Sequence, residues 1–171
     1  MIDTIPAIQT PRLVLRAFRD TDLGDYAAIC ADAEVMRYIG SGETADRVNA
    51  WRQMAVFNGH WSLEGSGMWA VELKDSGRCI GRIGLYGPPH WPGLELGWVL
   101  GRSHWGCGLA HEGADAARRW AFEVLGCPRL ISLIHPDNVR SIRLAQVLGA
   151  QADGECDLLG QSALRHLHRW P

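Results

Sequence analysis

Two glycines separated by one residue lie between an apolar segment and an alanine-rich stretch. The run Trp105-Gly106-Cys107-Gly108-Leu109-Ala110 is followed directly by a helical pattern from His111 to Leu125. The first N–H groups of a helix have no partner within it and carry partial positive charge, so they stabilise a phosphate without a lysine. Glycine leaves these groups unobstructed because it has no Cβ. The spacing therefore predicts an anion-binding loop, with a plain tight turn as the alternative.

Two other phosphate-binding loops are excluded by the residues that follow the second glycine. The Walker loop needs a lysine and then a serine or threonine, but Leu109 and Ala110 follow Gly108. The dinucleotide fingerprint needs a third glycine at the position that His111 occupies. We therefore do not expect binding of ATP, GTP or NAD through these loops.

The loop resembles the acetyl-coenzyme A loop of the GNAT acetyltransferase superfamily, written Gln/Arg-x-x-Gly-x-Gly/Ala. Gly108 and Ala110 match its fourth and sixth positions, whereas Trp105 departs from the first. Trp followed by Gly-x-Gly is common in the Rim-type branch, which includes the ribosomal-protein N-terminal acetyltransferases, and the opening Thr10-Pro-Arg-Leu-Val-Leu-Arg16 is also similar. The resemblance covers nearly the whole chain. It implies acetyl-coenzyme A as the cofactor, with its pyrophosphate on residues Trp105 to Ala110.

A second segment, Pro136-Asp-Asn-Val-Arg-Ser141, resembles the Asn-x-x-Ser element of the same family. The resemblance implies that Asn138 reaches backbone or cofactor amides and that the Ser141 hydroxyl lies near the sulfur of the cofactor. Asn138 is also a favourable N-cap for the helix predicted to start there. The two roles can coexist.

The strand that precedes the loop is expected to hold the pantetheine arm. Ligands of open α/β sheets lie beyond the carboxyl ends of the strands, so the backbone of Trp98, Val99 and Leu100 is placed to pair with the amides of the arm. In the family this strand has a bulge and diverges from the next strand, and Gly97 is a suitable position for weakened pairing. With the bulge present, the N–H near Val99 is expected to stabilise the oxyanion.

Acetyl transfer to an amine needs a base for the ammonium proton, a donor to the oxyanion and an acid for the thiolate. Glu95 lies on the strand face opposite Leu94 and Leu96, from which it could act on the amine directly or through water. A weak base suffices, because an α-amino group has a pKa of about 7.7–8.0. An outward, salt-bridged Glu95 is the alternative. His135, at the end of a later strand, is the other candidate base.

The acid that protonates the thiolate is missing at its usual place. Many family members have a tyrosine four residues beyond Ser141, where this chain has Ala145, and Ala150 stands where the family usually has phenylalanine. The thiolate would then be protonated by Ser141 with a water, or by the proton that the amine releases. The second route is open because a thiol has a pKa of about 8.5, so its anion is only a modest base. The missing tyrosine also motivates a rival hypothesis, a non-catalytic acyl-coenzyme A sensor.

The acceptor side of the cleft is expected to be walled by the two helices near the N-terminus. Tyr38, Trp51 and Trp61, together with His135, are the candidate acceptor-binding residues, with core packing as the alternative for the aromatic ones. The resemblance implies protein N-terminal amines as the first candidate acceptors and small-molecule amines as the second. The few acidic residues between Met36 and Trp61 do not favour a polycation. The chain is consistent with a monomer or a homodimer.

No metal site is expected. His166 and His168 share one face of the last predicted strand, but no third ligand lies nearby in sequence. Cys107 at the helix start is interpreted as a small residue tolerated in the loop, although such a position lowers a thiol pKa. The five cysteines are odd in number and form no Cys-x-x-Cys pair, which predicts reduced thiols rather than disulfides or a zinc site: Cys30, Cys79, Cys107, Cys127 and Cys156.

Length and composition are those of a globular protein. The chain has 171 residues, 47% hydrophobic and 21% charged, which suits one domain over residues 1–171. No apolar run approaches the ~20 residues that span a bilayer, and the N-terminus lacks signal-peptide features, so we expect a cytoplasmic protein without membrane attachment. A net charge of −2, with Lys74 the only lysine, argues against direct nucleic-acid binding.

The remaining patterns predict an α/β (α+β) fold, and the resemblance implies the GNAT fold. We expect a mixed, mostly antiparallel sheet of about six or seven strands, splayed between the fourth and the fifth, and four flanking helices. The strands are expected at 12–18, 68–74, 78–86, 94–100 and 129–135, with a terminal hairpin over 151–169 that turns near Gly160. The helices are expected from 20 to about 32, from Thr44 with Val48, Trp51 and Ala55 on one face, and over 111–125 and 138–148.

Overall fold

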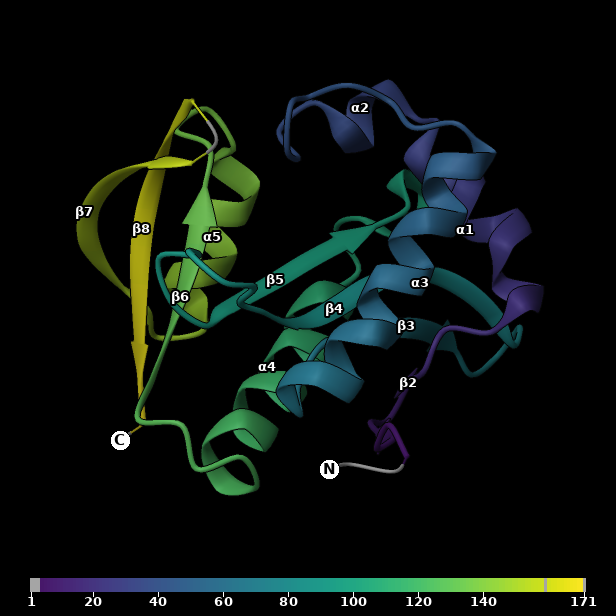
Figure 1. The fold of residues 1–171 in the computed structure, drawn as a ribbon, viewed down its shortest axis with the longest axis horizontal. Helices are drawn as coiled ribbons and strands as arrows, with labels where there is room; N and C mark the ends of the chain where they lie inside the picture. The colour runs from purple at the N-terminus through teal and green to yellow at the C-terminus, as the bar shows by residue number, and fades with distance from the viewer. Residues whose placement is uncertain (1–3, 159, 171) are drawn as a thin grey trace.

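An eight-stranded sheet forms the centre of the computed structural model, which describes residues 4–158 and 160–170 (Figure 1). The strand order is β1-β2-β3-β4-β5-β6-β8-β7. Among the strands of the described residues, only β5 and β6 pair in parallel, which confirms the expected mixed, mostly antiparallel sheet. The strands are β1 (Ile8–Gln9), β2 (Leu13–Arg16), β3 (Met68–Leu73), β4 (Arg78–Tyr86), β5 (Glu95–Leu100), β6 (Arg129–Ile134), β7 (Gln151–Leu158) and β8 (Gln161–Arg169).

Five α-helices flank the sheet in the part of the chain that the structure describes, one more than expected. The extra helix is the single turn α2, where the Asp32 carboxylate accepts from the Glu34 N–H at 2.9 Å. None of the helices in these residues is long and apolar enough to cross a membrane. The helices are α1 (Leu23–Cys30), α2 (Ala33–Met36), α3 (Arg47–Glu64), α4 (Leu109–Glu123) and α5 (Val139–Val147).

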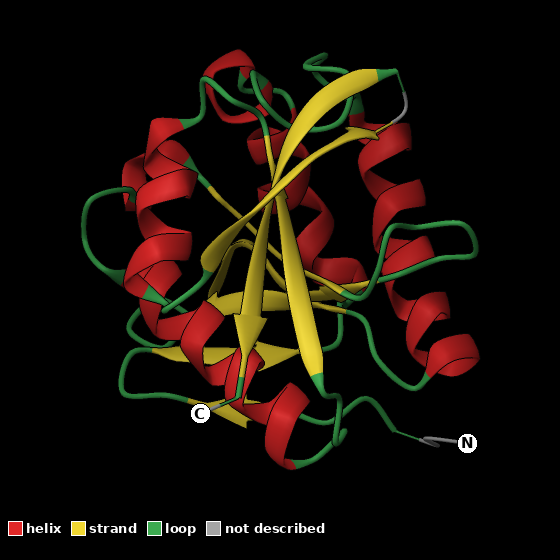
Figure 2. Ribbon diagram, turned by 90° about the vertical axis from the view of Figure 1, so that its left-hand side faces the viewer, coloured by secondary structure: helices red, strands yellow, loops and turns green. Residues whose placement is uncertain are grey.

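The helices form two layers with the sheet between them (Figure 2). Helices α1 and α3 cover one face, where Tyr26 and Phe57 pack in a common apolar cluster with Met68 of β3. Helix α4 covers the other face with the alanines 114, 117 and 121, all fully buried. Val124 is exposed, because α4 ends at Glu123, two residues before the predicted end of this helix.

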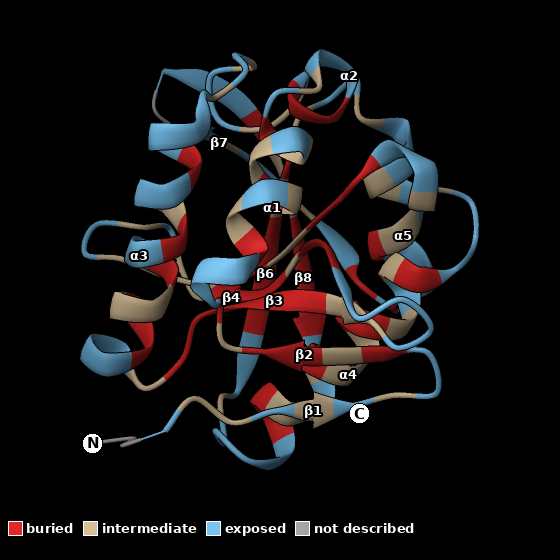
Figure 3. Ribbon diagram, turned by 90° about the vertical axis from the view of Figure 1, so that its right-hand side faces the viewer, coloured by how far each residue is buried: buried red, intermediate tan, exposed pale blue. Residues whose placement is uncertain are grey.

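Helix α3 turns a different face to the core from the one predicted (Figure 3). Val48 and Trp51 are more than half exposed, at 57% and 55%. The buried positions are instead Ala50, Met54 and Phe57. Apolar residues occur all around this helix, so its sequence period did not single out one face. The ring contacts of Phe57 with Phe18 and with Tyr86 of β4 decide the orientation.

Strands β5 and β6 diverge after a single pairing, Glu95 with Ile131, which confirms the expected splay (Figure 1). The Ile131 N–H donates to the Leu94 carbonyl at 3.0 Å, and the Ser132 hydroxyl donates to the Leu96 carbonyl at 2.7 Å. Beyond this point β5 stays with β4 and β6 stays with β8. The expected bulge in β5 is not present, because the β4–β5 register runs from Glu95 to Leu100 without a shift.

Glycine allows α4 to approach the sheet closely, which predicts opposite effects for two Gly→Ala changes. A Cβ at Gly113 would lie 2.6 Å from Cδ1 of buried Ile83, whereas a Cβ at Gly59 in α3 meets nothing within 4 Å. Gly59→Ala should raise the free energy of unfolding by about 0.5–1 kcal/mol through helix propensity. Gly113→Ala should lower it by about 1 kcal/mol or more through overpacking. Urea titration of both variants measures this, and equal stabilisation by the two changes would contradict the close approach.

Candidate active site

Two cavities meet where β5 leaves β6. The larger has a volume of about 620 Å³ and opens between α3, the loop after α2 and the strands β4 to β6. The smaller, of about 320 Å³, lies between the start of α4 and α5. Six residues line both cavities and therefore mark the junction: Tyr38, Ile39, Trp98, Val99, Asn138 and Ser141.

The glycine loop forms one wall of the smaller cavity. Gly106 and Gly108 have φ values of 73° and 76°, a left-handed conformation that favours glycine. Helix α4 begins at Leu109, two residues earlier than predicted, and its first internal bond is from the Glu112 N–H to the Gly108 carbonyl at 3.0 Å. The N–H groups of residues 109–111 thus have no acceptor within the helix. The loop has the backbone geometry of an anion site.

Contacts from distant parts of the chain hold this loop in place. Arg12 donates through Nη1 to the Cys107 carbonyl at 2.8 Å and through Nε to Glu112 at 2.7 Å. The indole N–H of Trp105 donates to the Leu100 carbonyl at 2.8 Å. The Cys107 side chain is exposed and does not line the cavity. The sequence analysis missed Arg12, because 95 residues separate it from the carbonyl that it binds.

Two arginines of α5 add positive charge beside the loop, and the sequence analysis missed them. The guanidinium carbon of Arg140 lies 3.9 Å from the centroid of the Trp105 ring. Arg143 lines the same cavity. Stacking on an aromatic face leaves the edge of a guanidinium free to donate to an anion. Their spacing of three residues on a helix was a usable signal, since it places both side chains on neighbouring positions of one face.

A hydrogen bond crosses the gap between β5 and α5. The indole N–H of Trp98 donates to the Ser141 hydroxyl at 3.2 Å, so the hydroxyl proton of Ser141 remains free to donate elsewhere. The Asn138 side chain accepts from the Ser141 N–H at 3.3 Å, which confirms its predicted role as N-cap. Ala145 is fully buried in a small cluster with Ala150.

The backbone N–H groups of β5 that point into the gap between β5 and β6 are not the ones that were predicted. Groups on alternate residues of a strand point to opposite sides. Because the Leu94 carbonyl binds β6 and the Gly101 N–H binds Ile80 of β4 at 2.9 Å, the Val99 N–H points to β4. The expected oxyanion role of the Val99 N–H is therefore wrong in this structure, because it required a bulge. The N–H groups that face the gap are those of Trp98 and Leu100.

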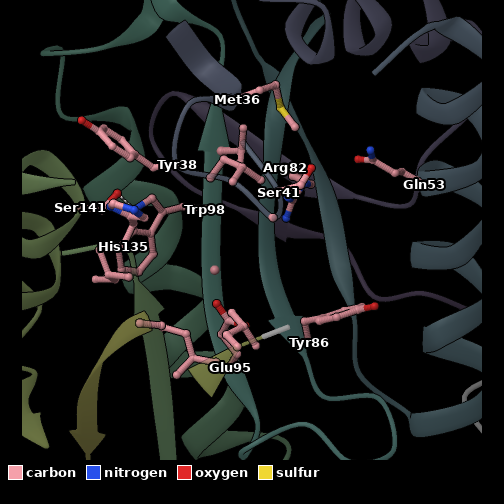
Figure 4. Close-up of a pocket in the computed structure, with 18 of the residues that line it drawn as sticks. Met36, Tyr38, Ser41, Gln53, Arg82, Tyr86, Glu95, Trp98, His135 and Ser141 are labelled. Carbon is pink, nitrogen blue, oxygen red and sulfur yellow. Dashed lines mark hydrogen bonds between the residues drawn. The ribbon is translucent and has the colours of Figure 1, made fainter. Parts of the chain in front are cut away.

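Glu95 lies in the wall of the larger cavity, directly opposite Tyr86 of β4 (Figure 4). Its carboxylate accepts from the indole N–H of Trp91 at 2.8 Å, and the Trp91 ring packs edge-on against Tyr86 with centroids 5.2 Å apart. Burial raises the pKa of Glu95 to about 7, against the opposing effects of the Trp91 bond and the Arg82 charge. No ion pair of Glu95 occurs among residues 4–158 and 160–170, which contradicts the outward, salt-bridged alternative. The sequence analysis also missed Trp91.

The predicted acceptor-side residues divide into two groups. Tyr38 and His135 line the larger cavity and stack on each other, with ring centroids 5.0 Å apart (Figure 4). Trp51 and Trp61 do not line it, so their predicted role is wrong. Trp51 points outward from α3. Trp61 is 1% exposed and packs against Trp69, because its indole N–H is fixed by the Met68 carbonyl at 3.1 Å.

A hydrogen-bonded histidine lies under the point where the strands diverge. Nε2 of His168 is 2.9 Å from the Ser132 hydroxyl, which gives its own proton to the Leu96 carbonyl. His168 therefore donates to Ser132, and burial lowers its pKa to about 4. The ring is neutral at physiological pH. His166, on the same strand, is also buried.

We predict that Glu95 titrates near pH 7, which ¹³C NMR of labelled carboxyl groups measures directly. Trp91→Phe should raise the midpoint, because the lost N–H donor stabilised the carboxylate. Trp170→Phe, in a ring pair with Phe122 away from the cavity, is the matched control and should leave it unchanged. Because the folded state holds this proton more tightly, stability should fall as pH rises through about 4.5 to 7, and Glu95→Gln should remove that slope. A titration midpoint of about 4.5 for Glu95 in the wild-type protein would contradict the burial of its carboxylate.

Comparison with known proteins assigns most of the chain to one family of enzymes. The model of the acetyltransferase (GNAT) domain matches residues 12–151. The uncharacterised N-acetyltransferase p20 of Bacillus licheniformis is 30% identical over 149 residues, which cover 86% of this chain and 83% of that protein. The crystal structure of an acetyltransferase from Agrobacterium tumefaciens is 32% identical, with a TM-score of 0.86 and coverage of 99% of this chain and 98% of that one.

A more distant similarity is to the fold alone. The structure of RimL, a ribosomal L7/L12 α-N-protein acetyltransferase in complex with coenzyme A, has a TM-score of 0.81 at 12% identity. It covers 96% of this chain and 98% of that chain. The two cavities, the glycine loop and the diverging strands thus occur in a chain that the family model matches over most of its length. This chain belongs to the GNAT acetyltransferase family.

Proposed function

We propose that this protein transfers an acetyl group from acetyl-coenzyme A to a primary amine at the junction of the two cavities. The observation that carries the proposal is their arrangement. A cavity with the glycine loop and a cavity with a partly buried Glu95, whose pKa is raised to about 7, share one wall at the gap between β5 and β6. Membership of the family implies the acetyl-coenzyme A donor.

The residues present fit coenzyme A. The N–H groups of 109–111 and the cations Arg140 and Arg143 suit its phosphates, and the unpaired backbone of β5 at Trp98 suits the amides of its pantetheine arm. When bound, acetyl-coenzyme A supplies the activated acetyl thioester. Ser141, at the junction, would then lie near the sulfur.

Glu95 is proposed as the general base. A base is most effective when its pKa lies near the working pH, and a pKa of about 7 lets Glu95 accept a proton from an ammonium group at neutral pH. Trp91 holds one carboxylate oxygen, which orients the group. His135 lines the same cavity and remains the alternative base.

Ser141 is proposed as the group that passes a proton to the thiolate. Its oxygen already accepts from Trp98, so its hydrogen is the part of the group that is free to donate. The proton would be replaced through a water or from the amine. Tyr38 lines both cavities as well and carries a second hydroxyl group.

For the acceptor, we propose a protein N-terminal amine, as in the Rim-type branch. Support comes from the Trp-Gly-x-Gly form of the loop and from the wide larger cavity. A small-molecule amine is the alternative. We further propose that residues 1–171 act as one domain, as a monomer or a homodimer, without direct nucleic-acid binding. The free cysteines of the described chain support a reducing compartment such as the cytoplasm.

The loop assignment predicts that Gly108→Asp weakens coenzyme A binding more than tenfold, as measured by isothermal titration calorimetry. The new carboxylate would place negative charge at the phosphate position, and the side chain would strain a backbone with φ of 76°. Gly126→Asp is the matched control, because Gly126 has a similar φ of 68° after the other end of α4 and should retain affinity. If the folded Gly108→Asp protein bound coenzyme A as tightly as the wild-type protein, the loop would not be part of the cofactor site.

The catalytic assignments predict that Glu95→Gln lowers kcat by roughly 10²-fold with little change in coenzyme A affinity, because the amide keeps the shape but not the basicity. Ser141→Ala should also lower kcat. The measurement is thiol release from acetyl-coenzyme A over a panel of peptides and amines. If both variants kept the wild-type kcat, neither residue would have its assigned role, and the protein would contribute only by positioning its substrates. Tight binding without turnover of any acceptor would favour the sensor hypothesis.

A further inference from the structure

The larger cavity contains a partly buried positive charge that the proposed mechanism does not use. Arg82 lies on β4 directly opposite Val99, and Tyr86 on the same strand lies opposite Glu95. Cross-strand partners share a face of the sheet, and residues four apart on one strand do as well. Arg82 and Glu95 therefore project into the same cavity, where Figure 4 shows both.

Arg82 lacks the ion pair that comparable arginines have. In the described part of the chain, the arginines that are at least partly buried are Arg16, Arg82, Arg118 and Arg165. The other three have carboxylate partners within 2.9 Å. No carboxylate of residues 4–158 and 160–170 lies within 4.0 Å of Arg82, and its Nε is buried without a hydrogen-bond partner. A buried charge without a partner is costly, which indicates that a ligand supplies the partner.

The surroundings of Arg82 hold its guanidinium in place but do not neutralise it. The guanidinium carbon lies 5.0 Å from the centroid of the Phe57 ring, and Nη1 is 3.9 Å from the Met68 sulfur. Gln53 of α3 projects into the cavity toward Arg82 (Figure 4). Its carbonyl oxygen accepts from the Tyr26 hydroxyl at 2.9 Å, so its NH₂ group is the part that faces the cavity. Two donors thus lie on the wall of the cavity that β4 and α3 form.

We propose that Arg82, assisted by Gln53, binds a carboxylate of the acceptor, so that the substrates are amines that also carry a carboxylate. This inference rests on the proposed function. A single guanidinium fork matches a carboxylate in shape and charge. A phosphate dianion fits less well, because Glu95 and Glu43 also line the cavity. The carboxylate belongs either to a free amino acid or to an acidic residue at the start of a peptide.

Matched acceptors that differ only in this charge test the proposal. Peptides with Glu or Gln at the first or second position, and free glutamate or glutamine, are compared by kcat/KM with acetyl-coenzyme A. The wild-type protein should prefer the carboxylate by about 10- to 100-fold, the range expected for a charge-assisted hydrogen bond. The acceptor pair with the largest ratio identifies the source of the carboxylate.

Substitution of Arg82 should abolish this preference. In Arg82→Gln the ratio should fall to near one, and Arg82→Lys should retain part of it. The ratio is the chosen readout because any effect of Arg82 on the basicity of Glu95 acts on both acceptors equally and cancels. Arg47→Gln is the matched control: Arg47 is exposed at the start of α3 and lines neither cavity, so its loss should leave the ratio unchanged. Thermal melting verifies that each variant is folded.

The outcomes separate this inference from the proposed function. If neutral and acidic acceptors react equally well, or if Arg82→Gln keeps the full preference, the carboxylate site is wrong while acetyl transfer stands. If no acceptor reacts, acetyl transfer is in doubt, and calorimetry of the Glu and Gln peptides with the coenzyme A-loaded protein tests the site directly. Arg82-dependent binding of the Glu peptide would then support the site, and equal binding of the two peptides would overturn it.

Discussion

The site depends on the point where β5 stops pairing with β6. One parallel pairing at Glu95 and a chain of hydrogen bonds from His168 through Ser132 to the Leu96 carbonyl hold the two strands together there. Beyond this point β5 stays paired with β4 and β6 stays paired with β8, each in a continuous antiparallel ladder, and so β5 and β6 diverge. The gap leaves backbone groups of Trp98 unpaired. Unpaired backbone groups persist only where water or a ligand satisfies them, which supports our proposal that the cofactor binds in this gap.

Charge is divided between the two sides of the gap. The smaller cavity collects the cations Arg140 and Arg143 and the positive end of α4, which suits a polyanionic cofactor. The larger cavity contains Glu95, whose pKa is raised to about 7 by burial, and Arg82, which has no carboxylate partner among the described residues. A thioester at the junction would therefore face a weak base rather than a strong charge. The hydrogen bond between Trp98 and Ser141 fixes the wall between the two sides.

Local patterns allowed correct prediction where the physical cause was itself local. The left-handed φ values of Gly106 and Gly108 and the cap at Asn138 depend on a few adjacent residues. Predictions that needed the orientation of a whole element failed. Trp51 and Trp61 were assigned to the cleft, but the direction of α3 exposes the first and buries the second.

The sequence by itself determined the order of the main strands and helices, the glycine turn that starts α4 and the cap of α5 at Asn138, because hydrophobic period, glycine and helix caps act over short distances. Only the tertiary structure decided what those residues meet. Arg12 reaches the loop across 95 residues, and the bulge expected at β5 is absent because the β4 ladder is unbroken. Arg82 has no carboxylate within 4.0 Å in the described part of the chain because of how β4 packs against its neighbours. These contacts are long-range, and no period in the sequence records them.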